Sequence, residues 1–281
     1  MPELPEVENI AQGLRKEIIS LGIKNIHVAQ PVIIRGRYRS TWRKSLSDYM
    51  DYSIAKVTRR GKRLIIILNN QRALLIQLGM TGSFILSDRR VRRQKHTHFY
   101  ITLSDETELR FVDPRRFGKL WLLDEVDDRN PDAAMETAGL SRLGPEPFDI
   151  TRKDFRNLLD HSKRPIKSLL LDQVRIAGLG NIYADESLFA AFIHPATVCD
   201  KITPEQADLL RRKIRAILKK AIAHGGTTFS DFRNAYGDMG RFLKMLKVYR
   251  RTALPCCRCQ TPIARMVISG RSSHFCPQCQ S

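Results

Sequence analysis

Long hydrophobic runs are missing from this chain of 281 residues. No stretch of about 18 consecutive apolar residues occurs, so the sequence predicts no membrane-spanning helix. The opening residues, Met1-Pro2-Glu3-Leu4-Pro5-Glu6, have neither the basic segment nor the apolar segment of a secretory signal. We therefore expect a cytoplasmic protein with no membrane partner. In such a reducing compartment the six cysteines are not expected to form disulfides.

Acidic residues are also scarce. The chain has 29 Asp and Glu against 48 Lys and Arg, a formal net charge of +19. Beyond residue 150 there are 23 basic residues against 10 acidic ones, and from Met239 to Ser281 there are eight basic residues and no acid. A field of this sign attracts polyanions, chiefly nucleic acid. Composition alone leaves open the alternative of a soluble basic surface with no such partner.

The apolar pattern changes from strands to helices along the chain. A helix is predicted over 6–20, followed by two hairpins (64–68 with 74–78, and 98–103 with 109–112) and a strand over 118–123. Helices are predicted at 182–192 and from Thr203 to Gly225, the latter opened by the capping pattern Thr-Pro-Glu-Gln. The fold class is therefore α+β.

The predicted domain organisation follows this change of pattern. A β-sandwich with a flanking helix is expected over 1–130, a linker rich in Asp, Pro and Gly over 131–149, a helical domain over 150–240 and a cysteine-rich finger over 241–281. A basic run, Arg89 to Lys95, lies between the two hairpins, and we interpret it as a mobile loop with a minor role.

Four cysteines near the C-terminus have the spacing of a zinc site. Cys256 and Cys259 form one C-x2-C pair, Cys276 and Cys279 form another, and sixteen residues separate the pairs. Each pair can curl around one metal while a hairpin returns the chain, which predicts one structural Zn²⁺. We interpret Cys257 as a spare thiol that points away from the metal.

Familiar catalytic patterns are absent, apart from one unusual feature at the N-terminus. The sequence has no Ser/His/Asp signature, P-loop or dinucleotide fingerprint. If Met1 is removed, Pro2 becomes a secondary amine, and terminal amines titrate at about 7.7–8.0. Such an amine can attack an aldehyde-like carbon to give a cationic iminium, and the neighbouring Glu3 could move protons. From residue types alone, an inert Met-Pro start is the commoner case.

Several blocks, taken together, resemble the formamidopyrimidine-DNA glycosylases, which are base-excision repair enzymes that also remove 8-oxoguanine. The blocks are Met1–Glu8, the lysine loop Arg59–Lys62, the wedge loops Leu78–Gly82 and Asp113–Gly118, the helix–two-turns–helix segment Gly178–Glu186, the lesion-capping loop Gly225–Thr228 with Asp231 and Phe232, and the finger from Cys256 to Gln280. They span nearly the whole chain in the family's order.

The resemblance assigns a role to individual residues. It implies that Pro2 is the Schiff-base nucleophile, Glu3 a proton donor, Lys62 the proton donor for β-elimination, and Arg271 the proton donor for δ-elimination and a phosphate contact. It also implies DNA contacts at Met80, Arg115, Phe117, Lys167 and Asn181. The implied partner is damaged double-stranded DNA, bound by a monomer in the bacterial cytosol or nucleoid.

Three positions depart from the family pattern. Gln77 stands where many members have His, and Arg250 and Gln260 stand where Gly is common. Gln77 puts one phosphate contact in question, and the other two put the path of the finger in question. Two rival functions stay open: an endonuclease VIII-like glycosylase for oxidised pyrimidines, and a damaged-DNA binder without catalysis.

Overall fold

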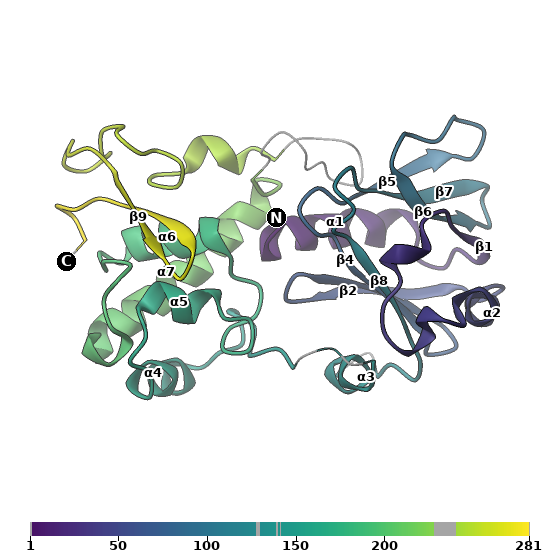
Figure 1. Cartoon of the computed structure of the whole chain (residues 1–281), viewed down its shortest axis with the longest axis horizontal. Helices are drawn as coiled ribbons and strands as arrows, with labels where there is room; N and C mark the ends of the chain where they lie inside the picture. The colour runs from purple at the N-terminus through teal and green to yellow at the C-terminus, as the bar shows by residue number, and fades with distance from the viewer. Residues whose placement is uncertain (1, 128–129, 139, 141, 228–239, 281) are drawn as a thin grey trace. The chain divides into compact units, whose positions relative to one another are not determined.

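The computed structural model describes residues 2–127, 130–138, 140, 142–227 and 240–280. The chain folds as two compact units: Met1–Arg142 with Gly225–Arg241, and Leu143–His224 with Phe242–Ser281. The first unit thus includes residues that follow the helical part of the sequence. Figure 1 labels the strands of the first unit and the helices of the second. These two units do not test the predicted division into sandwich, linker, helical domain and finger, which stays a prediction.

The first unit contains two four-stranded antiparallel sheets. Their strand orders are β1-β6-β7-β5 and β2-β3-β4-β8. The strands are β1 (Ile23–Val28), β2 (Ile54–Arg60), β3 (Arg63–Leu68), β4 (Ala73–Gln77), β5 (Ser83–Asp88), β6 (Thr97–Leu103), β7 (Thr107–Val112) and β8 (Lys119–Leu123). Helices α1 (Leu4–Glu17) and α2 (Trp42–Leu46) accompany them. The sandwich with a flanking helix and both predicted hairpins are confirmed, whereas β1, β2 and β5 were not predicted.

The apolar run in β3 does not alternate because both faces of its sheet are covered. Leu64, Ile66 and Leu68 belong to the main core, which also includes residues of α1 and of the other sheet. Ile65 and Ile67 point to a second core beside helix α3 (Asp132–Thr137). The segment predicted as a linker therefore contributes a packed helix, because Met135 and Ala134 cover the outer face of this sheet.

The second unit is helical and ends in a two-stranded hairpin. Its elements are α4 (Arg152–Asp160), α5 (Ile166–Leu171), α6 (Asn181–Ala190), α7 (Pro204–Ala223), β9 (Ala264–Ile268) and β10 (Arg271–Phe275). The predicted capping box of α7 is present: Thr203 N donates to Gln206 Oε1 at 3.0 Å, and Gln206 N donates to Thr203 Oγ1 at 3.3 Å. In α6, positions 182–189 are all buried, so α6 forms the centre of this unit.

No helix in the described part of the chain has the length and apolar character that a membrane crossing requires.

Candidate active site

The N-terminus of α1 is held by a reciprocal capping box. Glu3 N donates to Glu6 Oε2 at 2.8 Å, and the Glu3 side chain accepts from the backbone of Glu6. Both carboxyl groups lie on residues that are 2–3% exposed. The cap therefore holds Glu3, and Pro2 directly before it, at the start of the helix. Pro5 is tolerated because the first N–H groups of a helix have no partner within the helix.

Glu6 also anchors the segment that returns from the far part of the sequence. Thr227 donates to Glu6 Oε1 from its amide at 2.8 Å and from its hydroxyl at 2.9 Å. Gly226 has a φ of 79°, which favours glycine, and a Cβ there would lie 2.8 Å from the same oxygen. The start of the predicted lesion-capping loop is thereby tied to the helix of Pro2. Thr228, Asp231 and Phe232 of that loop lie outside the described residues.

Lys62 lies in a two-residue turn between β2 and β3. Arg60 pairs with Arg63 across the turn, and Gly61 takes a positive φ of 58°. Two ion pairs fix this turn to its surroundings. Arg59 Nε lies 2.9 Å from Glu8 of α1, and Arg60 Nη2 lies 2.9 Å from Asp132 of α3. Helix α1, which Pro2 precedes, and the turn that carries Lys62 are thus connected within one unit.

The two wedge loops pack against each other, and the structure brings Met80, Arg115 and Phe117 together. A Cβ on Gly79 would lie 2.6 Å from the carbonyl carbon of Phe117, so the loops touch through backbone. Met80 and Phe117 are 43% and 49% exposed, and the Arg115 guanidinium lies 5.0 Å from the Phe117 ring centre. Large apolar side chains held outward in this way suit insertion into a base stack.

Asp113 organises this pair of loops. Its side chain is fully buried and accepts from the Thr81 hydroxyl and, at 2.7 Å, from Gly118 N. Its backbone carbonyl accepts from His98 Nε2 at 2.6 Å. In the sequence, Asp113 is recognisable only as the first residue of the wedge-loop motif Asp113–Gly118. Its supporting role follows from burial, which a sequence does not display.

In the second unit, Lys167, Asn181 and Arg271 meet at one hairpin. Arg271 opens β10 and is exposed, while the carbonyl of the next residue, Ser272, accepts from Lys167 Nζ at 2.7 Å and from Asn181 Nδ2 at 2.9 Å. The Lys167 side chain is 0% exposed, although the resemblance implies a DNA contact for it. Its ammonium lies 2.6 Å from Asp185 Oδ1.

Asp185 also binds the far end of the same strand. Its Oδ2 accepts from His274 N at 2.9 Å and from His274 Nδ1 at 3.0 Å. Asp185 was not among the predicted site residues. The sequence signal that could have identified Asp185 is its position in the Gly178–Glu186 block, near the start of a predicted helix.

The adjacent Glu186 fixes the chain that enters the finger. Its carboxylate accepts from Lys247 N, Val248 N and Tyr249 N at 2.9–3.0 Å. Burial raises the pKa of Glu186, and these three N–H donors partly offset the shift.

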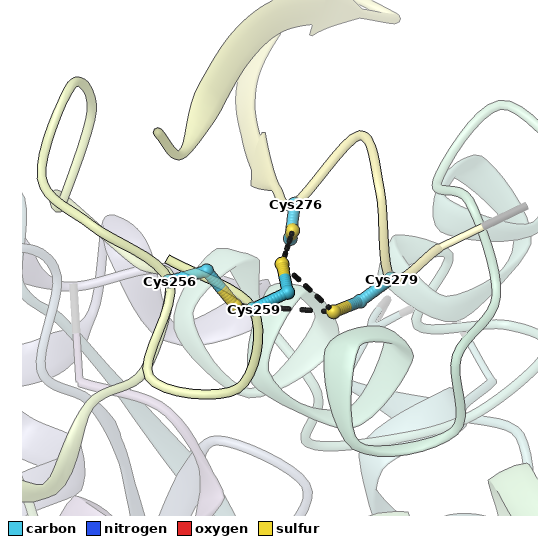
Figure 2. Close-up of side chains that lie close together, drawn as sticks. All are labelled: Cys256, Cys259, Cys276 and Cys279. Atoms are coloured by element: carbon cyan, nitrogen blue, oxygen red, sulfur yellow. Dashed lines mark hydrogen bonds between the residues drawn. The ribbon is translucent and has the colours of Figure 1, made fainter. Parts of the chain in front are cut away.

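The four predicted zinc ligands cluster, as Figure 2 shows. Their sulfur atoms all lie within 4.8 Å of one another, and Cys259 Sγ is 3.4 Å from both Cys276 and Cys279. Hydrogen bonds from Thr261 lower the pKa of Cys259 to about 6, while burial and the other thiols raise that of Cys279 to about 12. Such crowded thiols deprotonate together only around a cation, so the donor set fits one structural zinc. Cys257 is exposed and outside the cluster.

The departures at 250 and 260 both lie at positions with an unusual backbone conformation. Arg250 and Gln260 adopt φ values of 57° and 63°, the left-handed region that favours glycine. Glycine adopts this conformation at no steric cost, whereas in this chain two larger residues adopt it. Gln77 ends β4, paired with Arg63 and Lys119.

Comparisons with known proteins agree along the whole length. Family models match residues 1–120 (formamidopyrimidine-DNA glycosylase N-terminal domain), 143–233 (its H2TH domain) and 253–281 (a zinc finger found in FPG and IleRS). Formamidopyrimidine-DNA glycosylases of Ligilactobacillus salivarius and a Synechococcus species are 39% and 41% identical, each alignment covering 100% of this chain and 99% of the relative.

Solved structures show the same relationship. A Lactococcus lactis enzyme in complex with DNA that contains an oxidised pyrimidine has a TM-score of 0.88 at 34% identity, with both chains covered fully. The Thermus thermophilus protein has a TM-score of 0.85 at 38% identity, with 99% and 98% covered. The chain belongs to the formamidopyrimidine-DNA glycosylase family, whose members are DNA-binding base-excision glycosylases with lyase activity at abasic sites and one structural zinc.

Proposed function

We propose that this protein excises oxidised purines, namely 8-oxoguanine and formamidopyrimidines, from double-stranded DNA and then cleaves the strand. The observation that carries the proposal is the Pro2-Glu3 start, held at a capped helix that Glu6 ties to Thr227. A relative from Lactococcus lactis has been crystallised as a variant with DNA that contains Fapy-dG.

The proposed reaction begins at the N-terminal amine of Pro2. After removal of Met1, its nitrogen attacks C1′ of the damaged nucleotide, the bond from C1′ to the base breaks, and the base leaves with a proton. Glu3 protonates the ring oxygen, so the sugar opens and an iminium forms between C1′ and Pro2. The iminium is cationic without protonation and accepts electron density from C2′.

Two eliminations follow in the proposed scheme. Loss of a proton from C2′ expels the 3′ phosphate, with Lys62 as proton donor, and a second elimination expels the 5′ phosphate, with Arg271 as proton donor. Water then hydrolyses the iminium, which releases the unsaturated sugar fragment and regenerates Pro2. The product is a one-nucleotide gap with phosphates at both ends.

The remaining residues support binding in this proposal. Met80, Arg115 and Phe117 would fill the space left by the everted nucleotide, and Arg115 can bond the orphaned base. Asn181 and Lys167 would serve the phosphate grip of Arg271 through Ser272, since both donate to its carbonyl. We further propose a monomer acting on DNA in the bacterial cytosol, where the four thiols stay reduced for zinc.

A trapping experiment tests the nucleophile. Borohydride added during reaction with an 8-oxoguanine:cytosine duplex should reduce the iminium and give a covalent protein–DNA adduct. Pro2→Gly should lose most strand cleavage and the adduct, whereas the control Pro5→Ala, at a proline in the first turn of α1, should keep the adduct. Intact mass must first show that Met1 is absent. No adduct from a processed wild type that still binds the lesion would favour a binder without catalysis.

An oxidised-pyrimidine enzyme is the second candidate. The Lactococcus lactis relative bound to DNA containing an oxidised pyrimidine favours it. Rates of excision under single-turnover conditions should be compared for 8-oxoguanine opposite cytosine, thymine glycol and dihydrouracil. Faster excision of the two pyrimidines would overturn the purine assignment.

A further inference from the structure

The loop between β5 and β6, residues 89–96, carries a concentration of positive charge that the catalytic scheme does not use. Five of its first seven residues are basic: Arg89, Arg90, Arg92, Arg93 and Lys95. We call residues 89–96 the basic loop. The sequence alone predicts a minor role for the basic loop, whereas three features of the structure indicate a larger one.

The first reason is that a buried arginine holds the backbone of the basic loop. Arg110 of β7 is 0% exposed, and its Nη2 donates to the carbonyls of Asp88 at 3.0 Å and Val91 at 2.7 Å. Its Nε donates to Glu108 at 2.8 Å, so its charge is neutralised inside the sheet. A fully desolvated guanidinium bonded to successive carbonyls fixes the loop in one conformation.

The second reason is the pattern of ion pairs. Arg90 pairs with Asp88, Arg89 with Glu106, and Arg93 with Glu108 while its guanidinium stacks 3.8 Å from the Tyr100 ring centre. The exposed side chains of Arg92 and Lys95 have no carboxylate partner among the described residues. The paired cations shape the loop, and these two remain available to an external anion.

The third reason is continuity with the wedge loops. Asp113 N, at the start of the loop that carries Arg115 and Phe117, donates to the carbonyl of His96 at 3.0 Å. Thr97 Oγ1 donates to the carbonyl of Gln94 at 2.8 Å, which fixes the end of the basic loop beside it. The two unpaired cations are therefore presented by the backbone adjoining the proposed base-stack wedge.

From these observations we infer that the basic loop is a second phosphate-binding element, in which Arg92 and Lys95 contact backbone phosphates of the duplex outside the everted nucleotide. Duplex DNA carries one charge per about 1.7 Å of its axis, so an anchored pair of cations beside the wedge meets phosphates on any sequence. The side from which DNA approaches rests on the proposed function, whereas the anchoring and the free charges do not.

Salt dependence of binding provides the test. Each phosphate contact contributes about 0.9 to the slope of log affinity against log salt. The double variant Arg92→Ala/Lys95→Ala should therefore lower the slope for an undamaged duplex by about 2 and weaken binding about tenfold at low salt. Fluorescence anisotropy from 50 to 300 mM KCl, in the zinc-loaded full chain, measures both.

Arg90→Ala is the matched control, because Arg90 lies in the same loop and is 86% exposed but is paired with Asp88. Arg90→Ala should change the slope of log affinity against log salt by less than half as much as the single variant Arg92→Ala does. The single-turnover excision rate at saturating enzyme should be unchanged in Arg90→Ala, because this side chain touches no reacting atom in this scheme.

Two results would overturn the inference. One is an unchanged slope in the double variant, and the other is a change of slope in Arg90→Ala as large as that in Arg92→Ala. The first would also result if the loop instead binds an acidic protein. If the wild type failed to excise any lesion while the double variant still lost salt dependence, the proposed function would fail and the loop assignment would stand.

Discussion

The buried pair of Lys167 and Asp185 yields a prediction that combines stability with catalysis. Both side chains are 0% exposed, and the ammonium lies 2.6 Å from Oδ1. Asp185 also accepts two hydrogen bonds from His274, so the carboxylate joins α5, α6 and β10. Asp185→Leu would leave a buried ammonium without its counter-charge, which costs about 3–5 kcal/mol of unfolding free energy.

The double variant separates the charge from the shape. Lys167→Met/Asp185→Leu removes both charges and keeps apolar volume, so its cost should be much smaller than that of Asp185→Leu alone, within about 2 kcal/mol of wild type. The exposed pair Arg164–Asp172, 3.1 Å apart in the same unit, is the control. Removing Asp172 should cost about 0–1 kcal/mol.

Urea unfolding followed by circular dichroism at 222 nm is the suitable assay. Both tryptophans, Trp42 and Trp121, lie in the first unit, so their fluorescence would not report on the helices of the second. Equal losses in the single and double variants would refute the reasoning about an uncompensated charge. In the double variant, δ-elimination should fall more than base excision, because the hairpin of Arg271 loses two of its anchors.

Three further predictions concern other elements. Arg250→Gly and Gln260→Gly should each raise the unfolding free energy by about 0.5–1 kcal/mol, since both positions have φ near 60°; a loss of stability in thermal melts would contradict this. Removal of zinc by a chelator should abolish duplex binding, and addition of Zn²⁺ should restore it. Fluorescence anisotropy measures binding while a zinc-sensitive dye measures the released metal; full binding without metal would show that the finger is not needed to bind DNA. Burial opposes ionisation of Glu108, but Arg93 and Arg110 hold its pKa below the usual value. The stability that this carboxylate confers is therefore present above pH 4.5 and is lost as the pH falls. Glu108→Gln should show a shallower fall of Tm below that pH than wild type, and an identical profile would exclude this role.

Much of the fold could be predicted because its signals are local. Both hairpins, the capping box at Thr203 and the four-cysteine cluster depend on residues close in sequence, and the structure contains all of them. The missed strands β1, β2 and β5 contain fewer apolar residues than β3 and β4. Ile54–Arg60, for example, ends in Thr-Arg-Arg and owes its place to pairing with β3.

The candidate site could be predicted only in part, because its support is non-local. Resemblance supplied Pro2, Lys62 and Arg271, yet Glu6 reaches Thr227 across 221 positions and Asp185 reaches His274 across 89. Such partners have no fixed spacing for a pattern to detect. Lys167 illustrates the limit: its position matched a motif, but its burial shows an ammonium directed at Asp185 and the Ser272 carbonyl.

The buried carboxylates share one arrangement that explains how so basic a chain keeps its loops in place. Glu6, Asp113 and Asp185 each hold a segment that carries a proposed functional residue, and Glu108 does so through Arg110. None of the four acids is placed at the reacting sugar. In a chain of net charge +19, cations would repel one another within such loops unless anions were buried beneath them. These four acids therefore act as internal anchors, which leaves exposed Lys and Arg side chains to face DNA.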